Sequence, residues 1–223
     1  MALMDGSVDD LIGQGVFEPN ANRRLSDTVL HHVLMGIDYL SSKGIVHRDL
    51  KPANILFTKN SETDFHFLIA DFGVSNFASN AMTLVGSPRY AAPEVLCSDG
   101  SLQTSKADIW SLFVTMAHVL NVDGYRAKEF RTTAEIIQSA CDAAKCQELS
   151  TIKDMAIVEP EKRASAAKML QSLYGDTGLA TPLGHVDEPT EDPDQDHVSS
   201  PVPSTTGPAR GKKEKGKGKE RRV

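Results

Sequence analysis

The chain lacks the features that mark secreted, metal-bound and membrane-spanning proteins. It contains only three cysteines, Cys97, Cys141 and Cys146, and their positions fit no metal-ligand spacing. An odd number of scattered cysteines is typical of a reducing compartment. No apolar run approaches the ~18 residues of a membrane span, and residues 1–10 contain no basic side chain, which argues against a signal peptide. We expect an intracellular protein of the cytoplasm or nucleus without a membrane partner.

The chain also lacks an excess of positive charge, and its C-terminal part lacks aromatic residues. The net charge of −6 argues against nucleic acid as a partner. Residues 176–223 contain no aromatic residue but many Pro, Gly, Ser and Thr, so they cannot bury enough apolar area to fold. We expect a folded domain over residues 1–174 and a disordered tail over 175–223. The tail is first acidic and then basic, and the basic end is either a nuclear-import or anionic-surface signal or merely solvated.

Apolar periodicity predicts a mostly helical domain with one β-hairpin. Ser26 is the expected N-cap of a helix that ends at Lys43-Gly44. Two short apolar stretches, 55–57 and 65–70, flank a polar turn, which is typical of a hairpin. Further helices are predicted from Asp108 onward and over 133–141, 147–157 and 164–174.

Three motifs follow one another in the middle of the chain. Residues 47–54 read His-Arg-Asp-Leu-Lys-Pro-Ala-Asn, residues 71–73 read Asp-Phe-Gly, and residues 92–94 read Ala-Pro-Glu. In this order and spacing they resemble the signature of eukaryotic serine/threonine protein kinases. The resemblance covers roughly residues 1–174. It implies a protein-kinase-like α+β fold, represented here by the C-terminal lobe alone, mostly helical with short β-hairpins.

The resemblance assigns chemistry to four residues. Phosphoryl transfer depends mainly on positioning and charge neutralisation. Asp49 is then expected to orient the substrate hydroxyl and accept its proton, and Lys51 to stabilise charge on the transferred phosphate. Asn54 and Asp71 are the expected Mg²⁺ ligands, because this ion prefers oxygen donors that it shares with phosphates. The implied cofactors are ATP and Mg²⁺, and the implied partner is a protein substrate.

Other positions of the motifs are expected to hold the site together. His47 and Phe72 would pack beneath it, and Asp108 would hold the backbone of the catalytic loop. Glu94 would form a buried ion pair with Arg163. Ser87 would contact Asp49 and Lys51.

The segment from Asp71 to Glu94 resembles a kinase activation segment. Arg48 is expected to capture a phosphate on it, and the candidate phosphosites are Ser75, Ser79 and Thr83, modified by an upstream kinase. Two subfamily resemblances conflict. The spacing of Ser79 and Thr83 and the opening residues 3–7 are similar to MAP kinase kinases, whereas residues 86–94 look more like the AMP-activated kinase group.

A small, β-rich N-terminal lobe is not evident in the sequence. Lys43 is the only lysine before the catalytic loop, and its place after a helix does not suit the ATP-binding lysine of that lobe. Residues 11–17 mimic a glycine-rich loop, but they fit better as the end of a short helix. Residues 1–6 resemble the hinge between the lobes, with Met4 offering its backbone to adenine and Leu56 lying under the ring.

Two functions therefore remain open. The first is a serine/threonine kinase that needs a small lobe in order to act. The second is a pseudokinase-like interaction or regulatory module, for which apolar surface near Leu56, Ile69 and Phe72 would serve as a binding surface. Two places depart from the family's usual sequence. Phe113 stands where the family usually has glycine, and residues 121–131 lack the usual Gly-x-x-Pro-Phe. Both belong to the region where the family docks its substrates.

Overall fold

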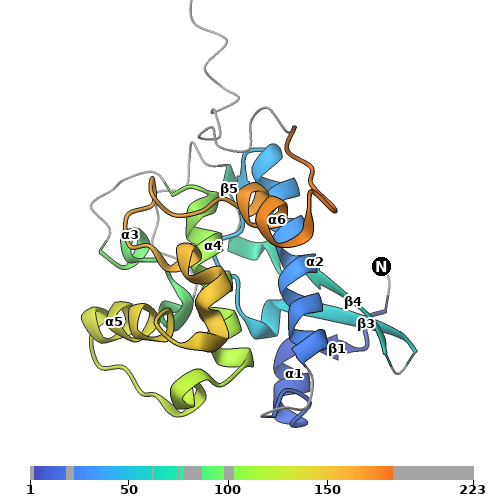
Figure 1. Ribbon diagram of the computed structural model, residues 1–223, viewed down its shortest axis with the longest axis horizontal. Helices are drawn as coiled ribbons and strands as arrows, with labels where there is room; N and C mark the ends of the chain where they lie inside the picture. The colour runs from blue at the N-terminus through green and yellow to red at the C-terminus, as the bar shows by residue number, and fades with distance from the viewer. Residues whose placement is uncertain are drawn as a thin grey trace, which may run out of the picture. The chain divides into compact units, whose positions relative to one another are not determined.

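The chain divides into two units, Met1–Pro193 and Asp194–Val223. The computed structural model describes residues 3–18, 23–61, 63–74, 76–77, 87–97 and 103–182, all within the first unit (Figure 1). The elements in chain order are β1 (Gly6–Ser7), α1 (Val8–Gly13), α2 (Arg23–Ser42), β2 (Ile45–Val46), η1 (Pro52–Asn54), β3 (Ile55–Ser61), β4 (Asp64–Ile69), η2 (Phe72–Val74), β5 (Asn76–Phe77), η4 (Pro88–Tyr90), α3 (Pro93–Leu96), α4 (Ser105–Val119), η5 (Val122–Ala127), α5 (Thr133–Ala143), η6 (Gln147–Ala156) and α6 (Ala166–Tyr174), where η marks a 3₁₀ segment.

Helices α2 and α4 form the centre of the domain. Helix α4 is buried on nearly all sides, with Trp110 and Phe113 fully enclosed. Helix α2 is amphipathic and turns Val33 and Ile37 into the core, where it packs against α4, α6 and β4. An apolar stripe at helical spacing is buried in this way because its transfer out of water drives packing.

The predicted hairpin is present and carries a third strand. Strands β3 and β4 pair antiparallel with Ile55 opposite Ile69, and β1 adds to the free edge of β3. Phe57 and Phe67 point into the core and are almost completely buried, whereas Leu68 points the other way and is 54% exposed. This alternation follows from the two-residue period of a strand. Strands β2 and β5 form a separate two-stranded sheet.

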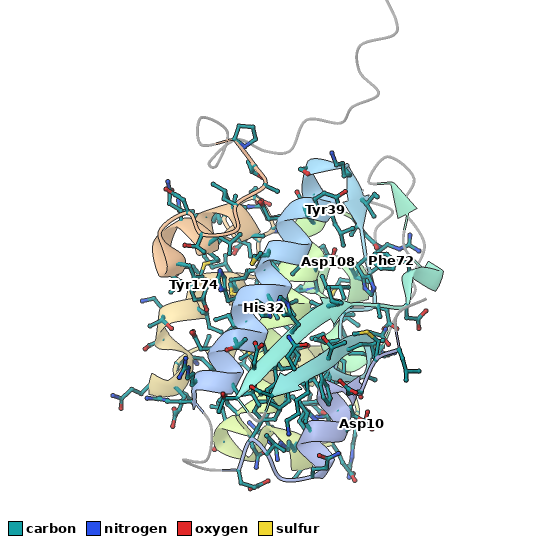
Figure 2. The ribbon with its side chains drawn as sticks, turned by 90° about the vertical axis from the view of Figure 1, so that its right-hand side faces the viewer. Asp10, His32, Tyr39, Phe72, Asp108 and Tyr174 are labelled. Atoms are coloured by element: carbon teal, nitrogen blue, oxygen red, sulfur yellow. The ribbon has the colours of Figure 1, made fainter. Side chains whose placement is uncertain are left out.

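A histidine of α2 fastens the hairpin to the helical part. The His32 ring lies between α2 and the strands, and its Nδ1 accepts the backbone N–H of Phe67 at 3.2 Å (Figure 2). The ring also stacks on His66, with 5.0 Å between centroids. Burial lowers the pKa of His32, and the nearby His66 and His31 lower it further. The neutral ring is therefore favoured, which is the form whose Nδ1 can accept a hydrogen bond.

Two predicted helices differ from the structure. Helix α2 begins at Arg23, and Ser26 is not its N-cap but lies inside it, where its hydroxyl donates to the Arg23 carbonyl at 2.9 Å. A serine can bond to the preceding turn in this way instead of capping. The predicted helix over 147–157 is the 3₁₀ segment η6. Its buried residues Leu149, Ile152 and Met155 recur every third position, which matches three residues per turn.

The end of the domain extends beyond the predicted boundary. Helix α6 ends at Tyr174 as expected. Residues 175–181, however, contact α2 rather than starting a disordered tail, and Thr181 donates its hydroxyl to Asp38 at 2.6 Å. The predicted tail from residue 183 onward lies outside the described residues. Among the described helices, none combines the length and the apolarity that a membrane crossing requires.

Candidate active site

A buried carboxylate holds the backbone of the catalytic loop. Asp108, near the start of α4, is fully buried and accepts the N–H groups of His47 at 2.8 Å and Arg48 at 2.9 Å. Burial raises the pKa of Asp108, although the two hydrogen bonds oppose that effect. The contact joins residues 60 positions apart in the chain, so it depends on the packing of α4 under the loop.

Asp49, Lys51 and Asn54 converge in front of this loop. The Lys51 ammonium donates to Asp49 Oδ2 at 2.6 Å. The Asn54 amide donates to the Asp49 carbonyl at 2.8 Å and to Asp49 Oδ2 at 3.1 Å. Residues 52–54 form the short segment η1, which turns the chain back so that Asn54 faces the residue five positions before it. The three side chains therefore form one hydrogen-bonded group.

Ser87 joins this group from the far end of the activation segment. Its N–H donates to Asp49 Oδ1 at 2.8 Å, and its hydroxyl accepts from Lys51 Nζ at 2.9 Å. Burial alone would raise the pKa of the Asp49 carboxyl, but the hydrogen bonds from Lys51 and Ser87 outweigh it and hold the pKa below its usual value. Asp49 is thus favoured as a carboxylate, the form that accepts a proton.

Asp71 follows β4 and lies beside the catalytic loop. Ala70, the residue before it, donates its N–H to the Asn54 carbonyl at 2.9 Å and accepts a bond from His47 Nε2 at 3.0 Å. Asp71 has a φ of 62° and Arg48 a φ of 73°, values that are rare outside glycine. The His47 ring meets Phe72 edge-on, with 5.2 Å between centroids. The motifs are therefore held together by the backbone as well as by side chains.

The oxygen donors of Asp71 and Asn54 suit a magnesium ion. Asp71 is exposed, and its carboxylate accepts one backbone N–H, from Gly73 at 3.3 Å. Asn54 uses its amide nitrogen for Asp49, which leaves its oxygen for a cation. In the described residues no three His, Cys, Asp or Glu side chains gather into a metal site. This donor set still fits Mg²⁺, which commonly takes one or two protein oxygens and completes its shell with water and phosphates.

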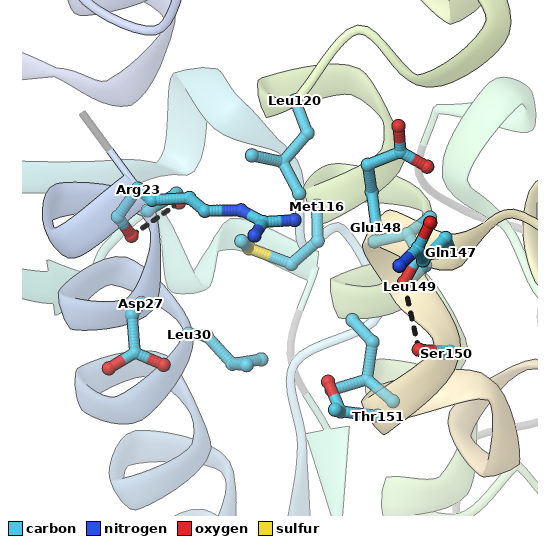
Figure 3. Close-up of a pocket in the computed structure, with 12 residues that line it drawn as sticks. Arg23, Asp27, Leu30, Met116, Leu120, Gln147, Glu148, Leu149, Ser150 and Thr151 are labelled. Carbon is cyan, nitrogen blue, oxygen red and sulfur yellow. Dashed lines mark hydrogen bonds between the residues drawn. The ribbon is translucent and has the colours of Figure 1, made fainter. Parts of the chain in front are cut away.

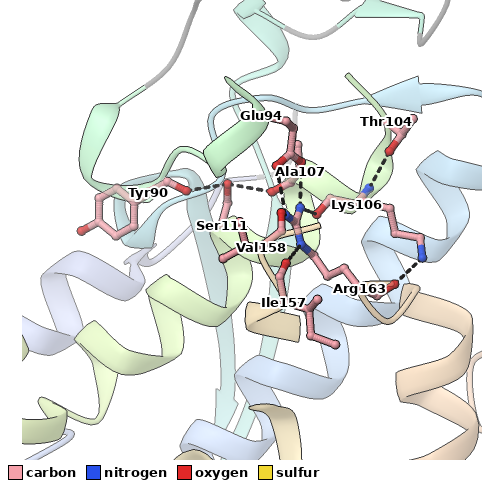
Figure 4. A network of polar contacts seen from close by, with 9 residues as sticks. All are labelled: Tyr90, Glu94, Thr104, Lys106, Ala107, Ser111, Ile157, Val158 and Arg163. Carbon is pink, nitrogen blue, oxygen red and sulfur yellow. Dashed lines mark hydrogen bonds and ion pairs between the residues drawn. The ribbon is translucent and has the colours of Figure 1, made fainter. Parts of the chain in front are cut away.

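Arg163 and Glu94, the last residue of the activation segment, form an ion pair that is largely buried. Arg163 Nη1 and Nη2 donate to the two Glu94 oxygens at 2.7 and 2.9 Å. The remaining guanidinium hydrogens reach the carbonyls of Ile157, Val158 and Lys106 (Figure 4). The guanidinium also lies over the Trp110 ring, 5.2 Å from its centroid. All five donors of Arg163 are used, which is the condition under which a charge can be buried.

Arg48, the residue between His47 and Asp49, is partly buried. Its Nε and Nη1 atoms are buried and have no hydrogen-bond partner in the described part of the chain. Burial lowers the pKa of this guanidinium, and Asp108 opposes the shift. The phosphosite candidates Ser75, Ser79 and Thr83 all lie outside the described residues.

The two residues predicted to contact the nucleotide, Met4 and Leu56, lie before β1 and within β3. Met4 precedes β1 and is half-buried, and the next residue, Asp5, donates its N–H to the Phe57 carbonyl at 2.9 Å. Leu56 is half-buried and pairs across the sheet with Leu68, on the same face. The assignment of Met4 and Leu56 to adenine stays a prediction of the resemblance.

Of the three residues expected on an apolar surface, Phe72 is exposed, whereas Leu56 and Ile69 are half-buried. Phe72 is 48% exposed and Leu68 is 54% exposed. Ile69 does not belong to this surface, because strand alternation turns it toward α2. Its Cδ1 lies only 2.8 Å from the position that a Cβ on Gly36 would take.

Arg89 is a structural residue that sequence reasoning missed. It follows Pro88 in η4 and donates to the carbonyls of Tyr125, at 3.1 Å, and Lys128. Its guanidinium lies 4.9 Å from the centre of the Phe130 ring. Arg89 thus ties the end of the activation segment to the loop that lacks the usual Gly-x-x-Pro-Phe. No spacing in the sequence indicates this pairing, because the partners are backbone carbonyls.

His118, under Tyr90, should make stability depend on pH. Burial, together with Arg89 and Arg126, lowers the pKa of His118 to about 4 from 6.5. Between pH 6.5 and 4, His118 is therefore mostly protonated in the unfolded state and mostly neutral in the folded state. The free energy of unfolding falls as the pH drops through this window.

Urea unfolding at pH 7 and pH 5 measures this effect. The wild type should lose more stability between the two values than His118→Gln, which cannot titrate there. Because His32 is intact in both proteins, their difference isolates His118. Equal losses in the two proteins would contradict the prediction.

A separate pocket lies away from these residues. It has a volume of about 380 Å³ and is lined by α2, α4 and η6, with Leu30, Met116 and Leu149 among its apolar residues and Arg23 and Glu148 among its charged ones (Figure 3). None of the predicted site residues is among the described residues that line it. The pocket therefore takes no part in the candidate active site.

Comparison with known proteins agrees with this geometry. Residues 1–175 match the family described as protein kinase domain. The ovarian-specific serine/threonine-protein kinase Lok of Drosophila melanogaster is 33% identical over 182 residues, covering 74% of this chain and 37% of Lok. Serine/threonine-protein kinase sid1 of Schizosaccharomyces pombe is 36% identical over 185 residues, covering 77% of this chain and 37% of sid1.

A plant relative gives the same result. CBL-interacting serine/threonine-protein kinase 5 of Arabidopsis thaliana is 30% identical over 194 residues, covering 80% of this chain and 41% of the relative. The chain thus spans well under half the length of these relatives. It belongs to the eukaryotic protein kinase superfamily, serine/threonine type.

Proposed function

We propose that this chain is the large lobe of a serine/threonine protein kinase that transfers the γ-phosphate of ATP to protein hydroxyls when a small lobe is supplied. The convergence of Lys51, Asn54 and Ser87 on the two carboxylate oxygens of Asp49 carries this proposal. The arrangement leaves a carboxylate of lowered pKa beside a cation at the front of the catalytic loop. Phosphoryl transfer requires this combination of a hydroxyl-orienting base and a charge-neutralising group.

Each residue of the group has a separate task in this proposal. Asp49 orients the substrate hydroxyl and takes its proton. Lys51 is held by Asp49 and Ser87 and presents positive charge to the transferred phosphate. Asp71 and Asn54 would hold Mg²⁺, which supplies charge neutralisation at the ATP phosphates when bound.

The need for a small lobe rests on the sequence and on exposure. Lys43 is the only lysine before the catalytic loop, and it follows α2 with its ammonium 5.6 Å from the Tyr39 ring centre. The exposure of Leu68 and Phe72 supports the view that another body covers this side of the large lobe.

Activation by phosphorylation is a further part of the proposal. The two unpartnered, buried nitrogens of Arg48 support capture of a phosphate from the activation segment. An upstream kinase would place that phosphate on Ser79 or Thr83, which the sequence offers in this segment.

A non-catalytic role is the second candidate. The same exposed side chains, Leu68 and Phe72, favour it, because an apolar surface at the lobe boundary can bind a partner protein without any reaction. In that role the chain would be a pseudokinase-like interaction module. The two candidates differ in whether nucleotide binding and transfer appear once a small lobe is present.

Nucleotide binding provides the test. The chain alone should show no Mg²⁺-dependent stabilisation by ATP. A fusion of the chain behind the small lobe of a serine/threonine kinase of known activity should be stabilised by about 2.7 kcal/mol at an ATP concentration 100 times Kd. Thermal melts with and without Mg²⁺ measure the difference, and transfer to a generic protein substrate is measured in parallel. A cooperatively folded fusion that neither binds ATP nor transfers phosphate would leave the interaction module as the better reading.

A further inference from the structure

Residues 175–181 form a strap along one face of helix α2. Thr177 presents its carbonyl to His31 Nε2 at 3.1 Å. Gly178 lies so close to Met35 that a Cβ on it would come within 2.6 Å of that side chain. Since His31, Met35 and Asp38 are spaced by four and three residues, they share one face of the helix. In Figure 1 the segment after α6 lies beside α2.

The strap ends on a buried carboxylate. Asp38 is 1% exposed, and its Oδ2 accepts the N–H groups of Ala180 at 2.6 Å and Thr181 at 2.9 Å. Its Oδ1 accepts the Thr181 hydroxyl at 2.6 Å. Within the described residues, every donor to this carboxylate comes from the strap. A charge removed from water is tolerated only when it is hydrogen-bonded, so the strap and the burial of Asp38 depend on each other.

The residue that completes this contact is followed by proline. Thr181-Pro182 is one of three places in the sequence where Ser or Thr precedes Pro, the others being Ser87-Pro88 and Ser200-Pro201. Thr181 is partly exposed and Pro182 is exposed. A modifying enzyme can therefore reach this pair from solvent after a local opening of the strap, because its attachment is a small number of polar contacts.

We propose that Thr181 is a phosphorylation site for a proline-directed serine/threonine kinase, and that the phosphate detaches the strap from α2. The Thr181 oxygen forms a bond to the γ-phosphorus of ATP while the bond from that phosphorus to the ADP oxygen breaks. The hydroxyl proton passes to a base of the modifying kinase, and ADP leaves. The product carries a phosphate of charge about −1.5 to −2, bonded to the oxygen that had donated to Asp38.

The geometry makes this modification incompatible with the closed strap. The Thr181 oxygen lies 2.6 Å from the carboxylate and loses its hydrogen on modification, so a donor contact becomes a repulsion between like charges. A phosphate beside an acidic residue disrupts the local structure for this reason. Phosphorylation of the open state therefore shifts the population away from the closed state.

The first experiment treats the full chain with a proline-directed kinase and Mg²⁺-ATP and maps phosphate by mass spectrometry. Phosphate on Thr181 is expected in the wild type and in the control variant Ser200→Ala, and it should be absent from Thr181→Ala. Gly178→Ala opens the strap without adding charge, because of the clash with Met35, and should speed modification of Thr181. Modification of Ser200 with Thr181 left unmodified would overturn the proposal.

The second experiment measures hydrogen exchange of the phosphorylated and unmodified chains. The amides of Ala180 and Thr181 should exchange at least about tenfold faster after modification, because the phosphate and Asp38 repel each other at short range. Amides of β3 and β4 should not change. In Asp38→Asn the same modification should have a much smaller effect, since the like-charge repulsion is gone. Unchanged protection in phosphorylated wild type would also overturn the proposal.

Discussion

Replacing Arg163 by alanine is expected to reduce the free energy of unfolding by about 3–5 kcal/mol, because the change leaves Glu94 buried without its charge partner. The Arg163 side chain is completely buried and that of Glu94 is 12% exposed. The substitution also removes the donors to the carbonyls of Ile157 and Lys106 and the contact with the Trp110 ring. Urea unfolding followed by circular dichroism measures the loss.

The neighbouring lysine is the matched control for this prediction. Lys162 is 68% exposed and lies 3.8 Å from Glu159 in a surface ion pair. Its replacement by alanine should change stability by no more than about 0.5 kcal/mol. If Arg163→Ala were as stable as Lys162→Ala, the prediction would be wrong. The Glu94–Arg163 ion pair would then not stabilise the attachment of the activation segment to the C-terminal helices.

Replacing Asp49 by asparagine is expected to lower phosphoryl transfer by about 10²–10⁴-fold, the usual contribution of a positioned acid or base. Asparagine keeps an oxygen for the Ser87 N–H but has no charge to hold Lys51 and cannot accept the substrate proton. The measurement is transfer of labelled phosphate by the fusion that carries a small lobe.

Two further measurements keep this prediction specific. Thermal melting should show that Asp49→Asn remains folded, which separates lost chemistry from lost structure. Asp142→Asn alters an exposed carboxylate that pairs with Lys145 and should leave transfer unchanged. Transfer by Asp49→Asn within about threefold of the unaltered fusion would remove Asp49 from the role of base, since general acid–base catalysis contributes far more.

The candidate site was accessible to sequence reasoning because its residues belong to short motifs. Asp49, Lys51 and Asn54 lie within one loop, so the distances between them depend mainly on local backbone geometry. Helix α4 was likewise predictable, since its apolar residues recur at helical spacing. The segment η6 was predicted as an ordinary helix because residues three apart lie on one side of an α-helix as well as of a 3₁₀-helix over two turns.

The sequence by itself determined the family and most of the helices and singled out the candidate catalytic residues, because motifs and periodicity are local properties of a chain. The contact of Asp108 with the catalytic loop was expected from the family resemblance. Only the tertiary structure decided that Arg89 meets carbonyls of the loop after α4 and that the Thr181 N–H meets Asp38. Each of these contacts uses a backbone N–H or C=O group. Nearly every residue carries both groups, so the residue types of the sequence do not indicate the contacts. They form where packing of the apolar core brings the segments together.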